Sequence, residues 1–270
     1  MPIRAILLDI DGTVAARDGA ISSVLMSTLA RARDRGVTIA CATARTHVSA
    51  RVRLGTLAWV ANEGVFHNGS VVVTNSAVTS AFAMPAATVA KAVTAARTVS
   101  SDVMISIHHA HRAPAFSAEL TAELLAHWGC AAADLRRFDD ALAEPSIKLG
   151  MWMPSEAPGS ITAVWAAVNA AVGHEATVFR ADADRFVFLT ASGVNKGSGG
   201  QAWFTARNLD PARTIAVGDD ITDAPLLSLC GHGIAITDGH PAALAAADSH
   251  VAAPPSDALA HALEQLLNNA

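Results

Sequence analysis

The chain has 270 residues, of which 51% are hydrophobic and 16% charged, a composition that excludes a disordered protein. The net charge is −5 and lysine and arginine form no dense block, which argues against nucleic-acid binding. No run approaches the roughly 20 uninterrupted apolar residues that cross a bilayer, so we expect no membrane span and no membrane partner.

The start of the chain and its cysteines bear on the compartment. The sequence MPIRAILLDIDGT reaches an aspartate at position 9 before a signal-peptide core could form, which predicts a cytoplasmic protein. Cys41, Cys130 and Cys230 are odd in number and lack CxxC spacing. We interpret them as small buried hydrophobic residues and not as disulfide, zinc or redox cysteines.

The first part of the chain has the pattern of a parallel α/β layer. Residues 3–9 form an apolar run without helical spacing, which is typical of a buried parallel strand. A helix is predicted over about 22–36, with serines as cap candidates at its start and a glycine at its end. Apolar runs at 37–41 and 59–61 predict two more strands, and strand–helix–strand order favours a parallel sheet.

The middle of the chain differs from its two flanks. There we predict helices from Pro85, near 117–128 and over 156–172, and strands at 103–107, 147–153, 176–180 and 185–190. The α/β pattern then returns, with helices at 196–207, from about Ile221, after Pro241 and from Ser256, and with strands at 214–217 and 233–236. We therefore predict an α/β core, 1–82 and 190–270, with a parallel sheet flanked by helices, and an inserted α+β domain, 83–189.

The sequence DIDGT places Asp9 and Asp11 directly after the first predicted strand, and Gly12 bends the chain. Ligands bind beyond the carboxyl ends of strands in open α/β sheets, so this end is a candidate site. An acidic turn is the alternative, because aspartate and glycine are common turn residues. Two crowded carboxylates repel each other unless a cation or proton offsets them, which favours a hard cation such as Mg²⁺.

A second acidic sequence, GDDITD, follows the predicted strand at 214–217. Asp219 and Asp223 are four residues apart, so they share a face if a helix begins here and can approach one ion. Acidic capping of a helix is the alternative. Two acidic strand ends in one sheet are harder to explain in that way, which strengthens the prediction of a cation site.

Three further side chains complete the candidate site. Thr43 ends the second strand, and its hydroxyl can bond a phosphoryl oxygen. Lys196 lies among glycines in GVNKGSG and is one of only three lysines among 19 basic residues, which indicates a charge-balancing role, with a solvated helix start as the alternative. Arg45 either clamps an anion or lies on the surface.

DIDGT, Thr43, Lys196 and GDDITD, in that order, resemble the four motifs of the haloacid dehalogenase superfamily of phosphotransfer enzymes. The insertion of 83–189 between the second and third motifs resembles the Cof-type sugar phosphatases, as do FHNGS at 66–70 and the sequence at 232–252. The resemblance implies a Rossmann-like core and an inserted cap that sets substrate specificity. Thr222 stands where Cof-type enzymes usually have asparagine and in this respect resembles trehalose-phosphate phosphatases, which leaves the subfamily open.

The resemblance also implies roles for these residues. Asp9 would be the nucleophile that forms an aspartyl-phosphate, and Asp11 the general acid and base. Mg²⁺ would be held by the Asp9 carboxylate, the Asp11 main-chain carbonyl and Asp219, with Asp223 behind it. The expected phosphate-binding residues are Thr43, Lys196 and the turn residues Gly12 and Thr13, and Arg45 and Asn68 are the candidate contacts near the leaving group.

Two groups in the inserted segment remain open. His108, His109 and His111 are interpreted as exposed or packing side chains, with a substrate contact or a transition-metal site as alternatives. Met151 and Trp152 are interpreted as core residues of a half-buried strand, with a sugar platform as the alternative.

The predicted function is that of a Mg²⁺-dependent phosphatase acting on a small phosphorylated metabolite, a sugar or polyol phosphate, as a monomer or small homo-oligomer. The alternatives are a phosphomutase or phosphotransferase on the same fold, an enzyme like the trehalose-phosphate phosphatases, and a non-catalytic binding module. Against the last, both acids of DIDGT are present.

Overall fold

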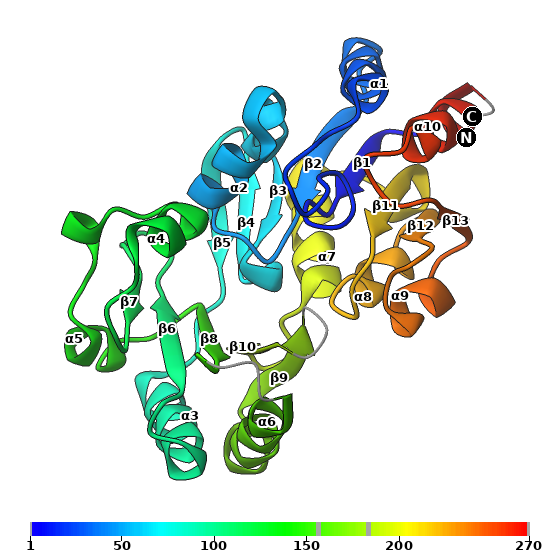
Figure 1. Cartoon of the computed structure of the whole chain (residues 1–270). Helices are drawn as coiled ribbons and strands as arrows, with labels where there is room; N and C mark the ends of the chain where they lie inside the picture. The colour runs from blue at the N-terminus through cyan, green and yellow to red at the C-terminus, as the bar shows by residue number, and fades with distance from the viewer. Residues whose placement is uncertain (1, 155–157, 182–184, 269–270) are drawn as a thin grey trace. The chain divides into compact units, whose positions relative to one another are not determined.

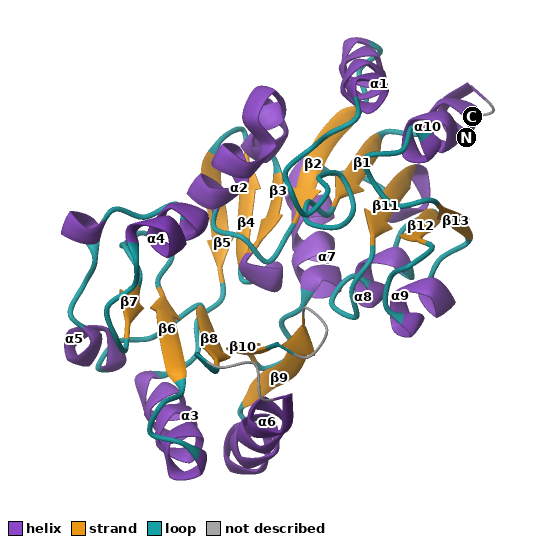
Figure 2. Cartoon of the chain, viewed as in Figure 1, coloured by secondary structure: helices purple, strands orange, loops and turns teal. Residues whose placement is uncertain are grey.

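The computed structural model describes residues 2–154, 158–181 and 185–268. The chain forms two compact units. Unit 1 comprises Met1–Ser80 and Lys196–Ala270, and unit 2 comprises Ala81–Asn195. Each unit has a sheet with its own helices (Figures 1 and 2).

The sheet of unit 1 has eight strands in the order β13-β12-β11-β1-β2-β3-β4-β5. Their bounds are β1 Ala5–Leu8, β2 Thr38–Ala42, β3 Gly64–Phe66, β4 Val71–Thr74, β5 Ala77–Ala81, β11 Thr214–Gly218, β12 His232–Ile236 and β13 Ser249–Val251. The strands from β13 through β3 are parallel, and β4 is antiparallel to β3. A sheet of this kind needs helical crossovers, which the chain supplies.

The register of the central strands aligns the ends that matter for the site. β1 is buried on both faces, as its uninterrupted apolar sequence predicts. Leu8 lies opposite Val217 of β11 and Cys41 of β2. The residues that follow these three strands therefore meet at one edge of the sheet.

The helices of unit 1 are α1 Ser23–Asp34, α2 His47–Leu54, α7 Lys196–Arg207, α8 Ala224–Leu227, α9 Pro241–Ala246 and α10 Ala258–Asn268. The predicted cap of α1 is present, because the Ser22 hydroxyl accepts a hydrogen bond from the Leu25 amide at 3.1 Å. α1 packs against α10, and α8 packs against α7 and α9. No helix among the described residues has the length and apolarity needed to cross a membrane.

One predicted strand of unit 1 is wrong, and one predicted helix is present but begins later than predicted. Residues 59–61 are not a strand but part of a 3₁₀ segment, Gly55–Asn62, which buries Leu57, Val60 and Ala61 on one side. A short apolar run fits either structure, so periodicity could not separate them. The helix predicted from about Ile221 begins only at Ala224, because 221–223 form a turn.

Unit 2 has a five-stranded sheet in the order β7-β6-β8-β10-β9. Its elements are α3 Ala86–Val99, β6 Met104–His108, β7 Ala115–Phe116, α4 Ala122–Trp128, α5 Phe138–Leu142, β8 Lys148–Trp152, α6 Pro158–Val172, β9 Ala176–Ala181 and β10 Phe186–Ala191. The helix predicted near 117–128 begins later, at α4, and β7 and α5 were not predicted. The predicted start of the helix at 156–172 lies partly outside the described residues.

The two faces of the unit 2 sheet carry different side chains. Alternate residues such as Ile105, Leu149 and Val187 form the apolar core with α3 and α6. The opposite face carries the residues between them, including Ser106, His108, Lys148, Trp152, Phe186, Phe188 and Thr190. The prediction of an α/β core with an inserted α+β domain is confirmed as a fold class.

The cysteines are free thiols, as expected, but they differ in burial. Cys41 is fully buried in β2, and burial together with the nearby Asp9 charge raises the pKa of its thiol. Cys130 and Cys230 are half-buried. Burial raises the pKa of Cys230 to about 11, so this thiol is protonated at neutral pH.

Candidate active site

Asp9 extends β1 by one residue at the edge of the sheet where the central strands end. Its amide donates to the Val217 carbonyl at 2.9 Å, and its side chain is buried. The chain then turns at Gly12, which has φ +81°. A Cβ atom at Gly12 would lie 2.5 Å from Asp219 Oδ2, so only glycine lets this turn approach Asp219 so closely.

Three carboxylates converge at this edge. One oxygen each from Asp9, Asp219 and Asp223 lie within 4.8 Å of one another. The Thr13 hydroxyl donates to Asp219 Oδ1 at 2.8 Å and so fixes one oxygen of that carboxylate. We call Asp9, Asp219 and Asp223 the carboxylate cluster.

Asp223 reaches the cluster from a turn and not from the helix face that the sequence suggested. Its Oδ2 accepts hydrogen bonds from the amides of Asp219 at 3.2 Å and Asp220 at 3.0 Å. A Cβ atom at Gly218 would overlap this carboxylate, so the glycine makes room for it. The Asp220 carboxylate is not in the cluster, and its Oδ1 accepts from the Ile221 amide at 2.7 Å.

Lys196 supplies the positive charge of the cluster. It is the first residue of α7 and is 2% exposed. Its Nζ donates to Asp9 Oδ1 at 2.7 Å and to Asp223 Oδ1 at 2.5 Å. The glycines after it are explained by packing, since a Cβ at Gly199 would lie 2.6 Å from the Gly69 Cα atom.

The electrostatics of the cluster leave an excess of negative charge. Burial raises the pKa of Asp9 well above its ordinary value, Lys196 opposes this, and Asp223 and Asp219 reinforce it. Burial, followed by the charge of Asp223, raises the pKa of Asp219 to about 7. Burial disfavours the Lys196 cation, but Asp223 and Asp9 outweigh burial and raise its pKa, so it stays charged.

The donor set fits a hard divalent cation. The cluster holds three carboxylate groups against one ammonium group, which pairs with two of them, so a further cation favours the ionised form of all three acids at neutral pH. Mg²⁺ prefers carboxylate oxygens and usually binds one or two of them together with water and phosphate. The described residues therefore contain one group of carboxylates able to hold such an ion.

Asp11 lies outside the carboxylate cluster, and its side chain is 44% exposed. Arg45 holds both of its oxygens, with Nε at 2.6 Å from Oδ2 and Nη2 at 2.8 Å from Oδ1. Arg53 Nε donates to Oδ1 at 3.0 Å. Burial opposes ionisation of Asp11, but the hydrogen bonds and charges of both arginines outweigh it and lower the pKa of this carboxyl.

Arg53 is the functional candidate that sequence reasoning missed. It belongs to none of the four motifs and is separated from Asp11 by 42 positions. The available signal was its place in a basic last turn of α2, a helix that itself was not predicted. Arg45, which the sequence suggested as a substrate contact, also lies against Asp11.

Thr43 and Asn68 lie at the same sheet edge but make no hydrogen bond to the carboxylates among the described residues. Thr43 is buried, and its hydroxyl accepts from the Arg45 amide at 3.2 Å. The Asn68 amide donates to the Thr43 carbonyl at 3.1 Å. Asn68 has φ +57°, and its carboxamide N and O are buried without a partner in the described part of the chain.

The turn residues Gly12 and Thr13 contribute differently. The Gly12 amide donates to the Ala15 carbonyl at 2.9 Å, so its own hydrogen bond is already used within the turn. Thr13 binds Asp219 through its hydroxyl, and its amide has no hydrogen-bond partner in the ranges that the structure covers. Thr13 is thus the better placed of the two as an amide donor.

The histidines of unit 2 form no three-ligand metal group among the described residues. His108 is buried, its Nε2 lies 3.1 Å from the Ser106 hydroxyl, and its ring lies 5.5 Å from the Trp128 ring. His109 Nδ1 lies 3.0 Å from the Pro145 carbonyl oxygen, and burial lowers its pKa. These contacts fit the packing interpretation.

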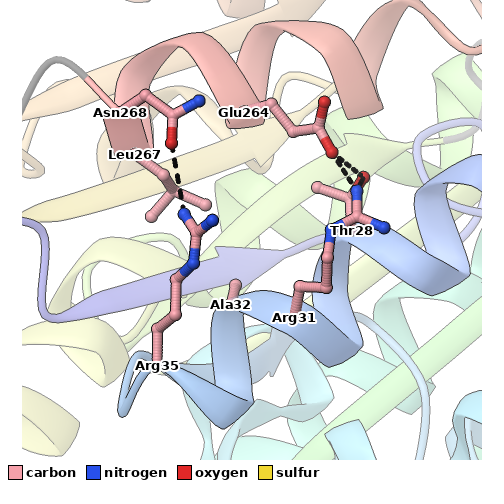
Figure 3. A pocket seen from close by; sticks show the side chains of 7 residues that line it. All are labelled: Thr28, Arg31, Ala32, Arg35, Glu264, Leu267 and Asn268. Carbon is pink, nitrogen blue, oxygen red and sulfur yellow. Dashed lines mark hydrogen bonds and ion pairs between the residues drawn. The ribbon is translucent and has the colours of Figure 1, made fainter.

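One pocket lies between α1 and α10 (Figure 3). It is lined by Thr28, Arg31, Ala32, Arg35, Glu264, Leu267 and Asn268. Arg31 pairs with Glu264, and Arg35 donates to Asn268 at 3.2 Å. Both arginines are held by residues of the pocket itself, and none of the sequence-predicted site residues lines it.

The chain is similar in sequence to a known family and, over a short stretch, to a known protein. The sequence profile of the haloacid dehalogenase-like hydrolases matches residues 6–263. The phosphoglycolate phosphatase of Haloarcula marismortui is 40% identical over 55 residues, which are 20% of this chain. That match spans 24% of the length of the relative.

Solved structures similar to this chain cover nearly all of it. A haloacid dehalogenase-like hydrolase from Bacteroides thetaiotaomicron has a TM-score of 0.80 at 20% identity, covering 98% of this chain and 99% of its own. The subclass IIB sugar phosphatase BT4131 has a TM-score of 0.79 at 19% identity, covering 97% and 98%. A HAD/COF-like hydrolase from Plasmodium vivax has 0.85 at 17%, covering 100% and 97%. At these identities the likeness establishes the fold.

Proposed function

We propose that this chain, which belongs to the haloacid dehalogenase-like hydrolase family, is a Mg²⁺-dependent phosphatase acting on a small phosphate monoester. The family match confirms the predicted family and the predicted class of enzyme. The observation that carries the proposal is the carboxylate cluster, in which the Lys196 ammonium binds Asp9 and Asp223 directly. That arrangement supports the proposal, because the Asp9 carboxylate lies beside two further carboxylates able to hold a cation and beside a fixed positive charge.

Asp9 is the proposed nucleophile. One of its carboxylate oxygens attacks the phosphorus atom, an aspartyl-phosphate forms, and the bond from phosphorus to the leaving alcohol oxygen breaks. Asp9 must be ionised to attack, although burial raises its pKa. Lys196 favours the ionised form, and Mg²⁺, held by Asp9, Asp219, Asp223 and the Asp11 carbonyl, would supply further charge neutralisation when bound.

Asp11 is the proposed general acid and base. In its protonated form it gives a proton to the departing alcohol oxygen in the first step, and as a carboxylate it takes one from water in the second, which restores the acid. That water oxygen attacks phosphorus, the bond to Asp9 breaks, and inorganic phosphate leaves. Proton transfer of this kind typically contributes about 10² to 10⁴-fold to the rate.

Phosphate binding is assigned to donors around the cluster. Lys196 uses two of its three N–H groups on Asp9 and Asp223, so one is available for a phosphoryl oxygen. The Thr13 amide and the Thr43 hydroxyl are proposed to bind the others. The Asn68 carboxamide, buried without a partner among described residues, is proposed to contact the leaving group.

Unit 2 is proposed to select the substrate, which we assign to the sugar or polyol phosphates. Its sheet face carries a row of rings, with Trp128 and Trp152 stacked at 5.9 Å and Phe186 at 6.0 Å from Trp152. Aromatic faces suit the apolar side of a sugar ring. The fold likeness to a subclass IIB sugar phosphatase supports the same class of substrate.

A panel of phosphate esters tests this function. It contains sugar and polyol phosphates, trehalose phosphate, phosphoglycolate and an aryl phosphate, and released phosphate is measured with Mg²⁺ and with a chelator. We expect hydrolysis of sugar or polyol phosphates that the chelator stops and Mg²⁺ restores. Failure to hydrolyse any ester contradicts the proposal, and activity that ignores the chelator contradicts the metal site. Isomerisation of a bisphosphorylated sugar without free phosphate would identify a mutase instead.

A further inference from the structure

Asp11 needs a fixed orientation for proton transfer, and its surroundings do not provide one by packing. The side chain is 44% exposed, so a bare carboxylate here would be free to rotate. General acid catalysis requires the acid within hydrogen-bond reach of the oxygen that it protonates. Whatever holds the Asp11 carboxylate in place therefore bears directly on the reaction.

Arg45 provides the first part of this restraint. Its guanidinium binds both Asp11 oxygens, a bidentate geometry that fixes the plane of a carboxylate. Arg45 is fixed in turn, because its Nη1 donates to the Ser49 hydroxyl at 2.8 Å in the first turn of α2.

Arg53 provides the second part and is anchored independently. Its Nη2 donates to the carbonyl of Ala16 at 2.5 Å and to that of Arg17 at 3.3 Å, while its Nε donates to Asp11 Oδ1 at 3.0 Å. The guanidinium therefore joins the last turn of α2, the loop after DIDGT and Asp11. Because main-chain carbonyls hold one end of it, its position does not depend on Asp11 alone.

We propose that Arg53 is a positioning residue for Asp11, which it orients together with Arg45 for proton transfer to the leaving group. The inference rests on the proposed function, because it requires that Asp11 act as acid and base. Arg53 need not touch the substrate. Both arginines lower the pKa of Asp11, so removal of Arg53 makes the protonated acid easier to form. A loss in the step that uses Asp11 would therefore come from lost orientation and not from lost acid, and the attack by Asp9 should stay intact.

The leaving group separates this role from a purely structural one. A 4-nitrophenolate ion leaves without being protonated, whereas an alkoxide leaving group needs a proton as it departs. In Arg53→Ala we expect kcat/KM to fall about 10-fold or more for an alkyl phosphate and about threefold or less for 4-nitrophenyl phosphate. Arg53→Lys should recover part of the alkyl loss, because lysine keeps the charge but not the planar fork.

Arg51→Ala is the matched control. Arg51 lies in the same turn of α2, but its Nη1 binds Asn62 Oδ1 at 2.7 Å and the Ala58 carbonyl at 3.3 Å, away from Asp11. Both esters should react with Arg51→Ala as with the wild type. Thermal unfolding is measured for each variant. If Arg53→Ala does not fold, Arg53→Lys tests the proposal in its place, and we expect an intermediate fall in kcat/KM for the alkyl ester only.

Equal losses for the two esters, or no loss, overturn the positioning role. If the wild type hydrolyses both esters and Arg53→Ala behaves like Arg51→Ala, only this inference fails. If the wild type hydrolyses neither, the proposed function fails and the inference falls with it.

Discussion

The two sheets of the molecule distribute their polar side chains in opposite ways. In unit 1 the central strands β1 and β11 are apolar apart from Thr214, and the charged residues come just after them, as Asp9 follows β1 and Asp219 follows β11. In unit 2 the polar residues lie within the strands on one face, such as His108 of β6 and Lys148 of β8. Lys148 Nζ there lies 3.9 Å from the centre of the Phe188 ring.

This difference follows from strand direction. Parallel strands bring all their carboxyl ends to one edge, so a few side chains meet there and their charges interact strongly. An antiparallel sheet has no such edge and presents a broad face of alternate residues. We therefore expect reaction chemistry to depend on single residues of unit 1, and discrimination between substrates to depend on unit 2.

The largest effect is expected for Asp9→Asn. Loss of the nucleophile should reduce kcat for an aryl phosphate by about 10³-fold or more. Catalytic residues act as a unit, so removal of one member abolishes most of the rate enhancement of the whole unit. Asp220→Asn is the control, since Asp220 neighbours the carboxylate cluster without belonging to it, and should keep most of the activity. Near wild-type turnover by Asp9→Asn refutes the nucleophile assignment.

An intermediate effect is expected on stability as pH and Mg²⁺ vary. The pKa of Asp219 is raised to about 7 in the metal-free fold, so the folded protein binds a proton that the unfolded chain releases above about pH 4. Stability from this group is thus full below about pH 4 and is lost as pH rises through about 7. Because Mg²⁺ binds the ionised carboxylate, its stabilising effect should grow over the same range.

Thermal unfolding at several pH values, with and without Mg²⁺, measures this effect. The rise in Tm on adding Mg²⁺ should be larger above pH 7 than near pH 5, and Asp219→Asn should reduce both the Mg²⁺ effect and its pH dependence. A Mg²⁺ effect of the same size at every pH contradicts the coupling between proton and metal.

The smallest effect is expected in unit 2. Trp152→Ala removes the central ring of the aromatic row and should change the ratio of kcat/KM between sugar phosphates by about 10-fold or less. Trp165→Ala, which alters the α6 side of the same unit, should leave that ratio unchanged. The same loss for every ester in Trp152→Ala contradicts a selective role for this face.

The parts of the site that the sequence predicted depend on local pattern and on sheet geometry. A buried apolar strand followed by acids recurs at Asp9 and at Asp219, and parallel pairing alone brings such ends together. Lys196 could be selected because lysine is rare in this chain. Each of these inferences uses information within a few residues of the side chain concerned.

The parts that were missed depend on long-range packing or on ambiguous short runs. Arg53 contacts Asp11 only because α2 returns along the DIDGT loop, which no local pattern encodes. Asp223 lies in a turn and not on a helix face, because its carboxylate accepts two backbone amides there. Residues 59–61 lie in a 3₁₀ segment and not in the predicted strand. The prediction failed because a run of three apolar residues fits more than one structure.

Trapping the phosphorylated enzyme is the most direct test of the route through Asp9. Asp11→Asn, which should slow hydrolysis of the intermediate, is mixed with a 4-nitrophenyl phosphate substrate and Mg²⁺, quenched in acid and mapped by peptide mass spectrometry. We predict a phosphoryl group on Asp9 and none in the Asp9→Asn, Asp11→Asn double variant. Release of phosphate by the wild type, together with a phosphoryl group found on another residue of the variant, would contradict that route.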